Sequence, residues 1–267
     1  MIKITPKAIK DFQTCGLLFD YRYNQKLPET ILSRNVVTER FENTLKNVIN
    51  FFLYKRQSGQ TPSYAAVLNR WEKLWFPKDT SAQDIINDKH ESAYGNMASL
   101  TSKAAGVLLS FYNYFSDPEL VPIGISEDYN LPIGQVLITD SFDIIYIKNG
   151  YTNVVKWVFN YKDSHEHLYN VDFVSMQYAY TKNRGSKNKN VRYGYFDIMS
   201  SNPKVEYVDF VQEDVDSLNF WVDELSACSN FVPRRGLTYY CKRCPFDGPC
   251  SKWSNWKKDK ENKDGKK

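Results

Sequence analysis

The chain has 267 residues, with 35 Lys and Arg against 31 Asp and Glu, and it contains five cysteines. A chain of this length can bury a substantial core, and its 42% hydrophobic and 25% charged residues exclude collagen-like, fully disordered and disulfide-dense classes. The net charge of +4 does not indicate a strongly basic nucleic-acid-binding body.

The first half of the chain carries helical patterns. Thr5 followed by Pro6 is typical of a helix start, and residues 34–56 repeat apolar side chains at helical spacing. No apolar run reaches the roughly 18 residues of a membrane span, and no signal peptide is visible. We therefore expect an intracellular, cytoplasmic protein without a membrane partner. Two further helices are predicted at 62–76 and 95–116.

The second half changes to strand patterns. Three strands are expected first, then a helix, two strands and a last helix, which indicates an α/β fold with a mixed central sheet flanked by helices. We expect one domain over 1–255 with a helical insertion at about 55–118, and a disordered basic tail over 256–267. The predicted elements are strands 121–130, 135–147 and 153–161, helix 172–183, strands 191–199 and 204–211, and helix 213–227.

A cysteine-rich segment lies near the end of the chain. Cys241, Cys244 and Cys250 follow the spacing C-x2-C-x5-C, with Pro and Gly residues that favour tight turns. Three cysteines within ten residues point to a metal site rather than to buried thiols. Either Cys15 or Cys228 could supply a fourth ligand, and the spacing fits a [4Fe–4S] cluster or Zn²⁺.

Two charged residues interrupt otherwise apolar strands. Asp143 lies between Phe142 and Ile144, and Lys162 ends the next strand after Asn160. The Asn149-Gly150 turn signal between the strands predicts a hairpin that brings them side by side. A carboxylate that holds a divalent cation beside a lysine suits phosphodiester hydrolysis. A buried Asp143–Lys162 ion pair without catalytic function is the alternative.

Taken together, these motifs resemble the PD-(D/E)xK nuclease superfamily, whose members share a restriction-endonuclease-like core. The chain is most similar to the RecB-like branch with iron–sulfur cysteines, which includes CRISPR-associated exonucleases and the AddB nuclease domain. The resemblance rests on Thr5 to Cys15, on Asp143, on Asn160-Tyr161-Lys162, on Gln177 with Tyr180, and on the C-terminal cysteine knuckle. It covers nearly the whole chain outside the helical insertion.

The resemblance implies a DNA nuclease that acts on ends or single strands, with partners from recombination, repair or phage-type replication. It implies Mg²⁺ or Mn²⁺ on Asp143, Asn160 and the carbonyl of Tyr161, with Lys162 positioning water and Gln177 supporting the site. It also implies a structural [4Fe–4S] cluster, and it leaves Cys228 as an ordinary thiol. The implied cluster ligands are Cys15, Cys241, Cys244 and Cys250.

The sequence departs from the family at two positions. Asn160 stands where the family has an acid, and by rough alignment Lys46 stands where this branch often carries a His. Glu127 and Glu42 are candidates to compensate for the missing charge. The departures favour a second hypothesis, a nuclease-like fold that has lost catalysis and serves as a DNA-binding or assembly module. A four-cysteine zinc protein of unrelated fold is a third.

Overall fold

The structure is a computed structural model, and it describes most of the chain with several gaps. Three groups of predicted features lie outside the described residues, namely the segment 160–162, Cys241 and the tail 256–267. The described residues are 1–29, 33–76, 97–159, 170–184, 190–200, 202–209, 211–231, 244–246 and 250.

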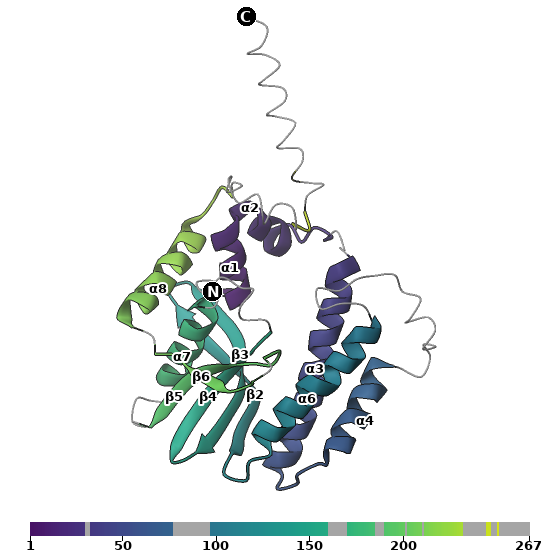
Figure 1. Ribbon diagram of the computed structural model, residues 1–267. Coiled ribbons are helices and arrows are strands. Elements are labelled where there is room, and N and C mark those ends of the chain that lie inside the picture. Colours follow the sequence, from purple (N-terminus) through teal and green to yellow (C-terminus); the bar gives the residue numbers. More distant parts are fainter. Residues whose placement is uncertain are drawn as a thin grey trace, which may run out of the picture.

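A six-stranded mixed sheet forms the centre of the molecule (Figure 1). The strand order is β1-β3-β4-β5-β6, and β2 pairs with β3. The pairs β1–β3 and β4–β5 are parallel, whereas the other pairs are antiparallel. The predicted α/β class with a mixed sheet flanked by helices is therefore confirmed. The strands are β1 (Ile2–Ile4), β2 (Val121–Ile133), β3 (Val136–Lys148), β4 (Tyr151–Val158), β5 (Val191–Asp197) and β6 (Val205–Tyr207).

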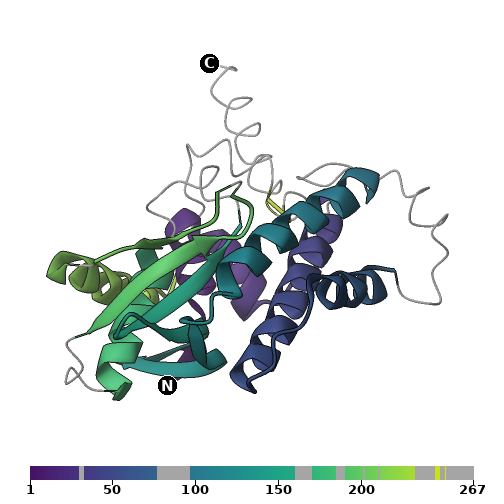
Figure 2. The ribbon, with the colours of Figure 1, turned by 60° about the horizontal axis from the view of Figure 1, so that its bottom comes forward.

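Helices cover both faces of the sheet (Figures 1 and 2). On one face lie α1 (Pro6–Thr14), α7 (Asn170–Arg184) and α8 (Gln212–Ala227), and on the other lie α3 (Ser33–Gln57), α4 (Tyr64–Trp75) and α6 (Met97–Phe115). Two short elements, α2 (Gly16–Phe19) and the π-helical turn η1 (Asp20–Asn24), follow α1. The helix start predicted at Thr5 is confirmed, since its Oγ1 accepts a hydrogen bond from the Ala8 N–H.

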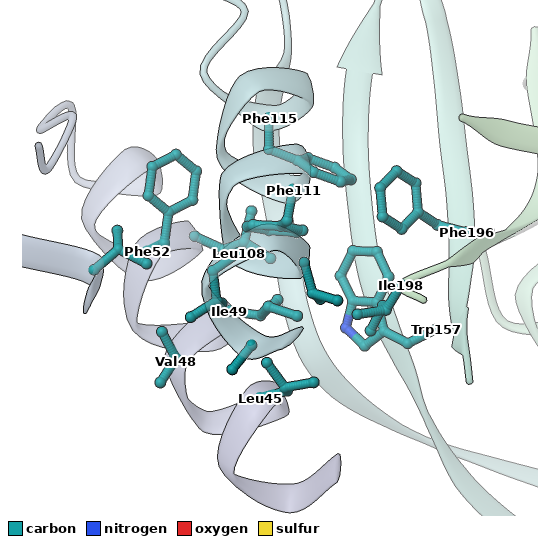
Figure 3. Close-up of a cluster of buried hydrophobic side chains, with 14 of the residues drawn as sticks. Leu45, Val48, Ile49, Phe52, Leu108, Phe111, Phe115, Trp157, Phe196 and Ile198 are labelled. Atoms are coloured by element: carbon teal, nitrogen blue, oxygen red, sulfur yellow. The ribbon is translucent and has the colours of Figure 1, made fainter. Parts of the chain in front are cut away.

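Each face of the sheet has its own hydrophobic core. We call the cluster on α1, α7 and α8 the α7 core, and the cluster on α3, α4 and α6 the α3 core. In the α3 core, Phe111 and Phe115 of α6 pack edge-to-face against Trp157 of β4, with ring centroids 6.0 and 5.6 Å apart (Figure 3). These aromatic contacts hold the end of β4 in place, and this end borders the candidate site.

Among the described residues, no helix is long and apolar enough to cross a membrane.

Candidate active site and cysteine cluster

One edge of β3 has a gap in its strand pairing. β1 pairs with β3 from Val136 to Ile138, and β4 pairs with the same edge from Ile144 onward. Between them, the segment 139–143 has no paired strand on that edge among the described residues. The gap leaves room for side-chain contacts between the strands, and Asp143 lies at the point where β4 diverges.

Both strands beside this gap change the face on which their side chains lie. On β3, Phe142 packs in the α7 core, whereas Ile144 packs in the α3 core, although alternation alone would put both on one face. On the partner strand β2, Ser126 has a positive φ of +49°. It falls between the register pairs Ile125–Ile144 and Glu127–Phe142, and so lies opposite Asp143. The register shift of β2 itself lies a few residues away, between Pro122 and Gly124.

Asp143 bridges the two diverging strands. Its Oδ2 accepts a hydrogen bond of 2.8 Å from the backbone N–H of Trp157 on β4. Burial raises the pKa of Asp143, while Lys156, the Trp157 N–H and Lys46 act to lower it. The fold therefore holds a carboxylate in a partly buried position and surrounds it with positive charge, an arrangement common at functional sites.

Next to Asp143 lies a network of charges that the sequence analysis missed. Lys156 of β4 forms an ion pair with Asp140 of β3, and Lys10 of α1 pairs with Asp172 of α7 at 2.5 Å. Burial lowers the pKa of Lys156, but Asp143, Asp140 and Asp172 outweigh it, so the net direction is upward. Lys156 therefore stays protonated and balances several carboxylates at once.

The network has one sequence signal that could have revealed it. Lys156 is a charged residue inside the apolar strand Val154-Val155-Lys156-Trp157-Val158, the same kind of signal that identified Asp143. Tyr129 carried no such signal. Its hydroxyl is buried without a hydrogen-bond partner among the described residues, and burial together with Asp140, Asp172 and Asp143 raises its pKa.

Lys46 lies close to the candidate centre. It comes from α3, and its ammonium lies 5.5 Å from the ring centroid of Phe159, the last described residue after β4. It also contributes to the electrostatics of Asp143. α3 therefore contributes a second positive charge, after Lys156 of β4, to the surroundings of Asp143.

The remaining predicted residues are only partly joined to this centre. Glu127 lies beside Ser126, and its carboxylate folds over Gly124, where a Cβ would come within 2.4 Å of Oε1. Gln177 donates through Nε2 to the carbonyl of Val208, and its Oε1 is buried without a partner among the described residues. Tyr180 packs edge-to-face on Phe142. Glu42 lies on α3 one helical turn before Lys46, and the hydrogen bond of Gln177 goes to Val208 rather than to Asp143.

The other predicted ligands of the centre follow directly after β4. Asn160, Tyr161 and Lys162 lie outside the described residues, one to three positions beyond Phe159. Within the described ranges, no three His, Cys, Asp or Glu side chains form a group that could hold a metal ion. The prediction that Asn160 and Tyr161 complete a site at Asp143 stays a prediction.

Three of the predicted cluster cysteines share one small apolar cluster. Its buried members are Leu17, Tyr21 and Phe246, and Cys15, Cys244 and Cys250 pack against them. Tyr21 and Phe246 contact each other with ring centroids 5.6 Å apart. The structure thereby brings the N-terminal Cys15 together with Cys244 and Cys250 near the C-terminus. We refer to these three cysteines and the apolar residues that they contact as the cysteine cluster. Cys228 packs in the α7 core instead.

Comparisons with known proteins find similarity in structure but none in sequence. The sequence matches no protein-family model and no curated protein. Among solved structures, it is similar to a crystal structure from Eubacterium rectale named "Putative exonuclease", with a TM-score of 0.47 and 8% sequence identity. The match covers 86% of this chain and 84% of that chain.

Proposed function

We propose that this chain is a divalent-metal-dependent DNA nuclease of the PD-(D/E)xK type. The observation that carries the proposal is the placement of Asp143, which lies in the gap of β3 and is bonded to β4 just before Asn160-Tyr161-Lys162. An acid that holds a divalent cation close to a lysine suits phosphodiester hydrolysis. Ends or single strands of DNA are the proposed substrates, in recombination, repair or phage-type replication.

The proposed ligands suit a hard cation. Asp143 supplies an anionic oxygen, and Asn160 and the Tyr161 carbonyl supply neutral oxygens, all of which Mg²⁺ and Mn²⁺ accept. When bound, the cation polarises the phosphate and lowers the pKa of water. Lys162 orients the attacking water in this proposal, and Gln177, with its unpartnered Oε1, supports the site. DNA cleavage that depends on Mn²⁺ or Mg²⁺ is the test of the proposal.

We also propose that the cysteine cluster holds a structural [4Fe–4S] cluster. Thiolates are the usual ligands of such clusters, and Cys15, Cys244 and Cys250 pack against one apolar cluster, although these three do not by themselves form a metal-binding group. Cys241 is the fourth ligand in this proposal. Bound iron and sulfide would tie the region after α1 to the C-terminal knuckle. Zn²⁺ is the alternative occupant of four cysteines.

Substitution of single cysteines separates this proposal from the zinc alternative. We expect protein purified without oxygen to be brown and to have an absorbance band at about 400 nm, which is typical of iron–sulfur ligation. Cys15→Ala should remove the band, because it deletes a ligand. Cys228→Ala is the matched control and should retain it, because Cys228 packs in the α7 core. A colourless wild-type protein that contains zinc would overturn the iron–sulfur assignment.

A nuclease-like module without catalytic activity is the second candidate function. Two ammonium groups, Lys156 and Lys46, act on Asp143, and Asn160 replaces the usual acid. The resident lysines thus supply positive charge at a place where a metal ion would otherwise supply it. Such a protein would bind DNA or assemble with other proteins without cleaving.

The substitution Asn160→Asp distinguishes the two candidates. If the wild type is a nuclease, it should cleave DNA, and Asn160→Asp should lower the Mn²⁺ concentration required for half-maximal rate, because a carboxylate binds hard cations better than an amide does. Asn160→Gln is the neutral control and should not lower it. A wild type without activity, combined with an active Asn160→Asp variant, would instead show that the natural chain is the inactive module.

A further inference from the structure

A hollow of about 500 Å³ lies between side chains of α3 and α4. α3 contacts β2 on one side and α4 on the other (Figures 1 and 2). The lining combines two cations, two aromatic rings, two amides and one hydroxyl. These residues are Asn47, Asn50, Phe51, Tyr54 and Lys55 of α3, Ser58 directly after it, and Arg70 of α4.

The two cations of this hollow are available to a ligand. Lys55 and Arg70 are exposed, and neither forms an ion pair with any residue that the structure describes. The Arg70 guanidinium lies 5.7 Å from the ring centroid of Phe51. None of the side chains that line the hollow is acidic. The lining is therefore complementary to an anion, and phosphate is an anion that Arg and Lys bind well.

The aromatic side of the hollow offers a stacking surface. Tyr54 is 50% exposed although its hydroxyl donates to the carbonyl of Ile125 at 3.2 Å, so the ring is held in place with much of its surface open. Asn50 adds a buried Oδ1 without a hydrogen-bond partner among the described residues. An ordered ring next to cations and amide groups is the combination that binds a base and its phosphate in single-stranded nucleic acid.

A hydrogen bond links the lining of the hollow to the strand residue opposite Asp143. Asn50 Nδ2 donates to the Oγ of Ser126 at 3.0 Å, and Ser126 lies opposite Asp143 in the register of β2 and β3. Lys46, which acts on Asp143, precedes Asn50 by one helical turn on α3. Asn47, which also lines the hollow, directly follows Lys46 on α3, so the hollow begins at the neighbouring residue of the helix.

We propose that this hollow binds a nucleotide of single-stranded DNA whose strand continues to the Asp143 centre. Lys55 and Arg70 bind its phosphate, and the Tyr54 ring stacks on its base. The inference rests on the proposed function for the direction of the strand, but binding in the hollow does not require cleavage.

Anisotropy of a labelled single-stranded oligodeoxythymidine of about 15 nucleotides tests the proposal, with EDTA present so that no metal-dependent cleavage occurs. The double variant Lys55→Glu/Arg70→Glu should weaken binding about tenfold or more, and loss of the one phosphate contact should reduce the salt slope by about 0.7. Lys3→Glu/Lys204→Glu changes the net charge equally at exposed positions elsewhere and should stay within about twofold of wild type.

The stacking contact needs its own pair of variants. Tyr54→Ala should weaken binding about fivefold or more, because it removes the ring, whereas Tyr54→Phe retains the ring and should bind nearly as wild type does. Equal binding by the Lys55/Arg70 variant and its charge-matched control, with both variants folded by circular dichroism, would overturn the inference. If the wild type cleaves DNA but the Lys55/Arg70 variant binds as the wild type does, only the inference about the hollow is refuted. If the variant binds more weakly but the wild type does not cleave DNA, only the nuclease proposal is refuted.

Discussion

Asp143→Asn is expected to abolish metal-dependent DNA cleavage, with a fall in rate of about 1000-fold, or about 4 kcal/mol of transition-state stabilisation. The amide retains the size of the carboxylate and an oxygen that can accept the Trp157 N–H. It lacks the negative charge that holds the cation. A timed assay of end-labelled DNA in Mn²⁺ measures the effect.

The same variant should remain folded, which makes its loss of activity interpretable. Because burial raises the pKa of Asp143, its ionisation in the folded protein costs stability. The loss of folding free energy is absent at pH values below the pKa of the unfolded state and reaches its full size above the pKa of the folded state. The Asp143→Asn variant does not carry this cost, so it should melt at no lower temperature than wild type at neutral pH. Asp223→Asn, at an exposed position of α8, is the matched control and should cleave normally. Cleavage by Asp143→Asn at the wild-type rate would refute the assignment.

Lys156→Met is expected to destabilise the fold by about 3 kcal/mol at neutral pH. Only 15% of the Lys156 side chain is exposed, and removal of one partner from a buried ion pair leaves the other charge uncompensated. Here Asp140 and Asp143 would lie close together without their common cation. Urea unfolding followed by circular dichroism measures the difference in unfolding free energy.

The pH dependence of this loss identifies its cause. Because the pKa of Lys156 is raised, its contribution in the wild type is fully present below about pH 10 and is lost as the pH rises through the folded value. In the variant, protonation of Asp143, whose pKa burial already raises, removes one of the unpaired charges, so the stability difference should shrink as the pH falls through the raised pKa of Asp143. The double variant Lys156→Met/Asp140→Asn should regain part of the loss. A difference that is constant with pH would indicate lost packing rather than lost charge.

The elements with clear periodicity were predicted from the sequence. The apolar spacing of residues 34–56 and the strand patterns after residue 121 correspond to α3 and to β2 through β6. Strand β1 was missed because Ile2–Ile4 is too short to show alternation, and its strand character comes from parallel pairing with Val136–Ile138. Local patterns cannot reveal a pairing that depends on residues more than a hundred positions away.

The same limit applies to the candidate site. Asp143 was found because a charge in an apolar strand needs a partner, but its contacts with Lys156 and the Trp157 N–H depend on how far β4 remains paired with β3. Lys10 and Asp172 are 162 positions apart, and neither belongs to a motif. The grouping of Cys15 with Cys244 and Cys250 was predicted from the resemblance, whereas Phe246, the buried residue among them, carried no signal.

The most direct test of the proposed nuclease is cleavage by the wild-type protein, purified without oxygen, of end-labelled single-stranded and double-stranded DNA. The reactions contain Mn²⁺, Mg²⁺ or EDTA. We predict that labelled ends are shortened with Mn²⁺ or Mg²⁺ and stay intact with EDTA. Intact DNA with both cations and on both substrates would contradict the account.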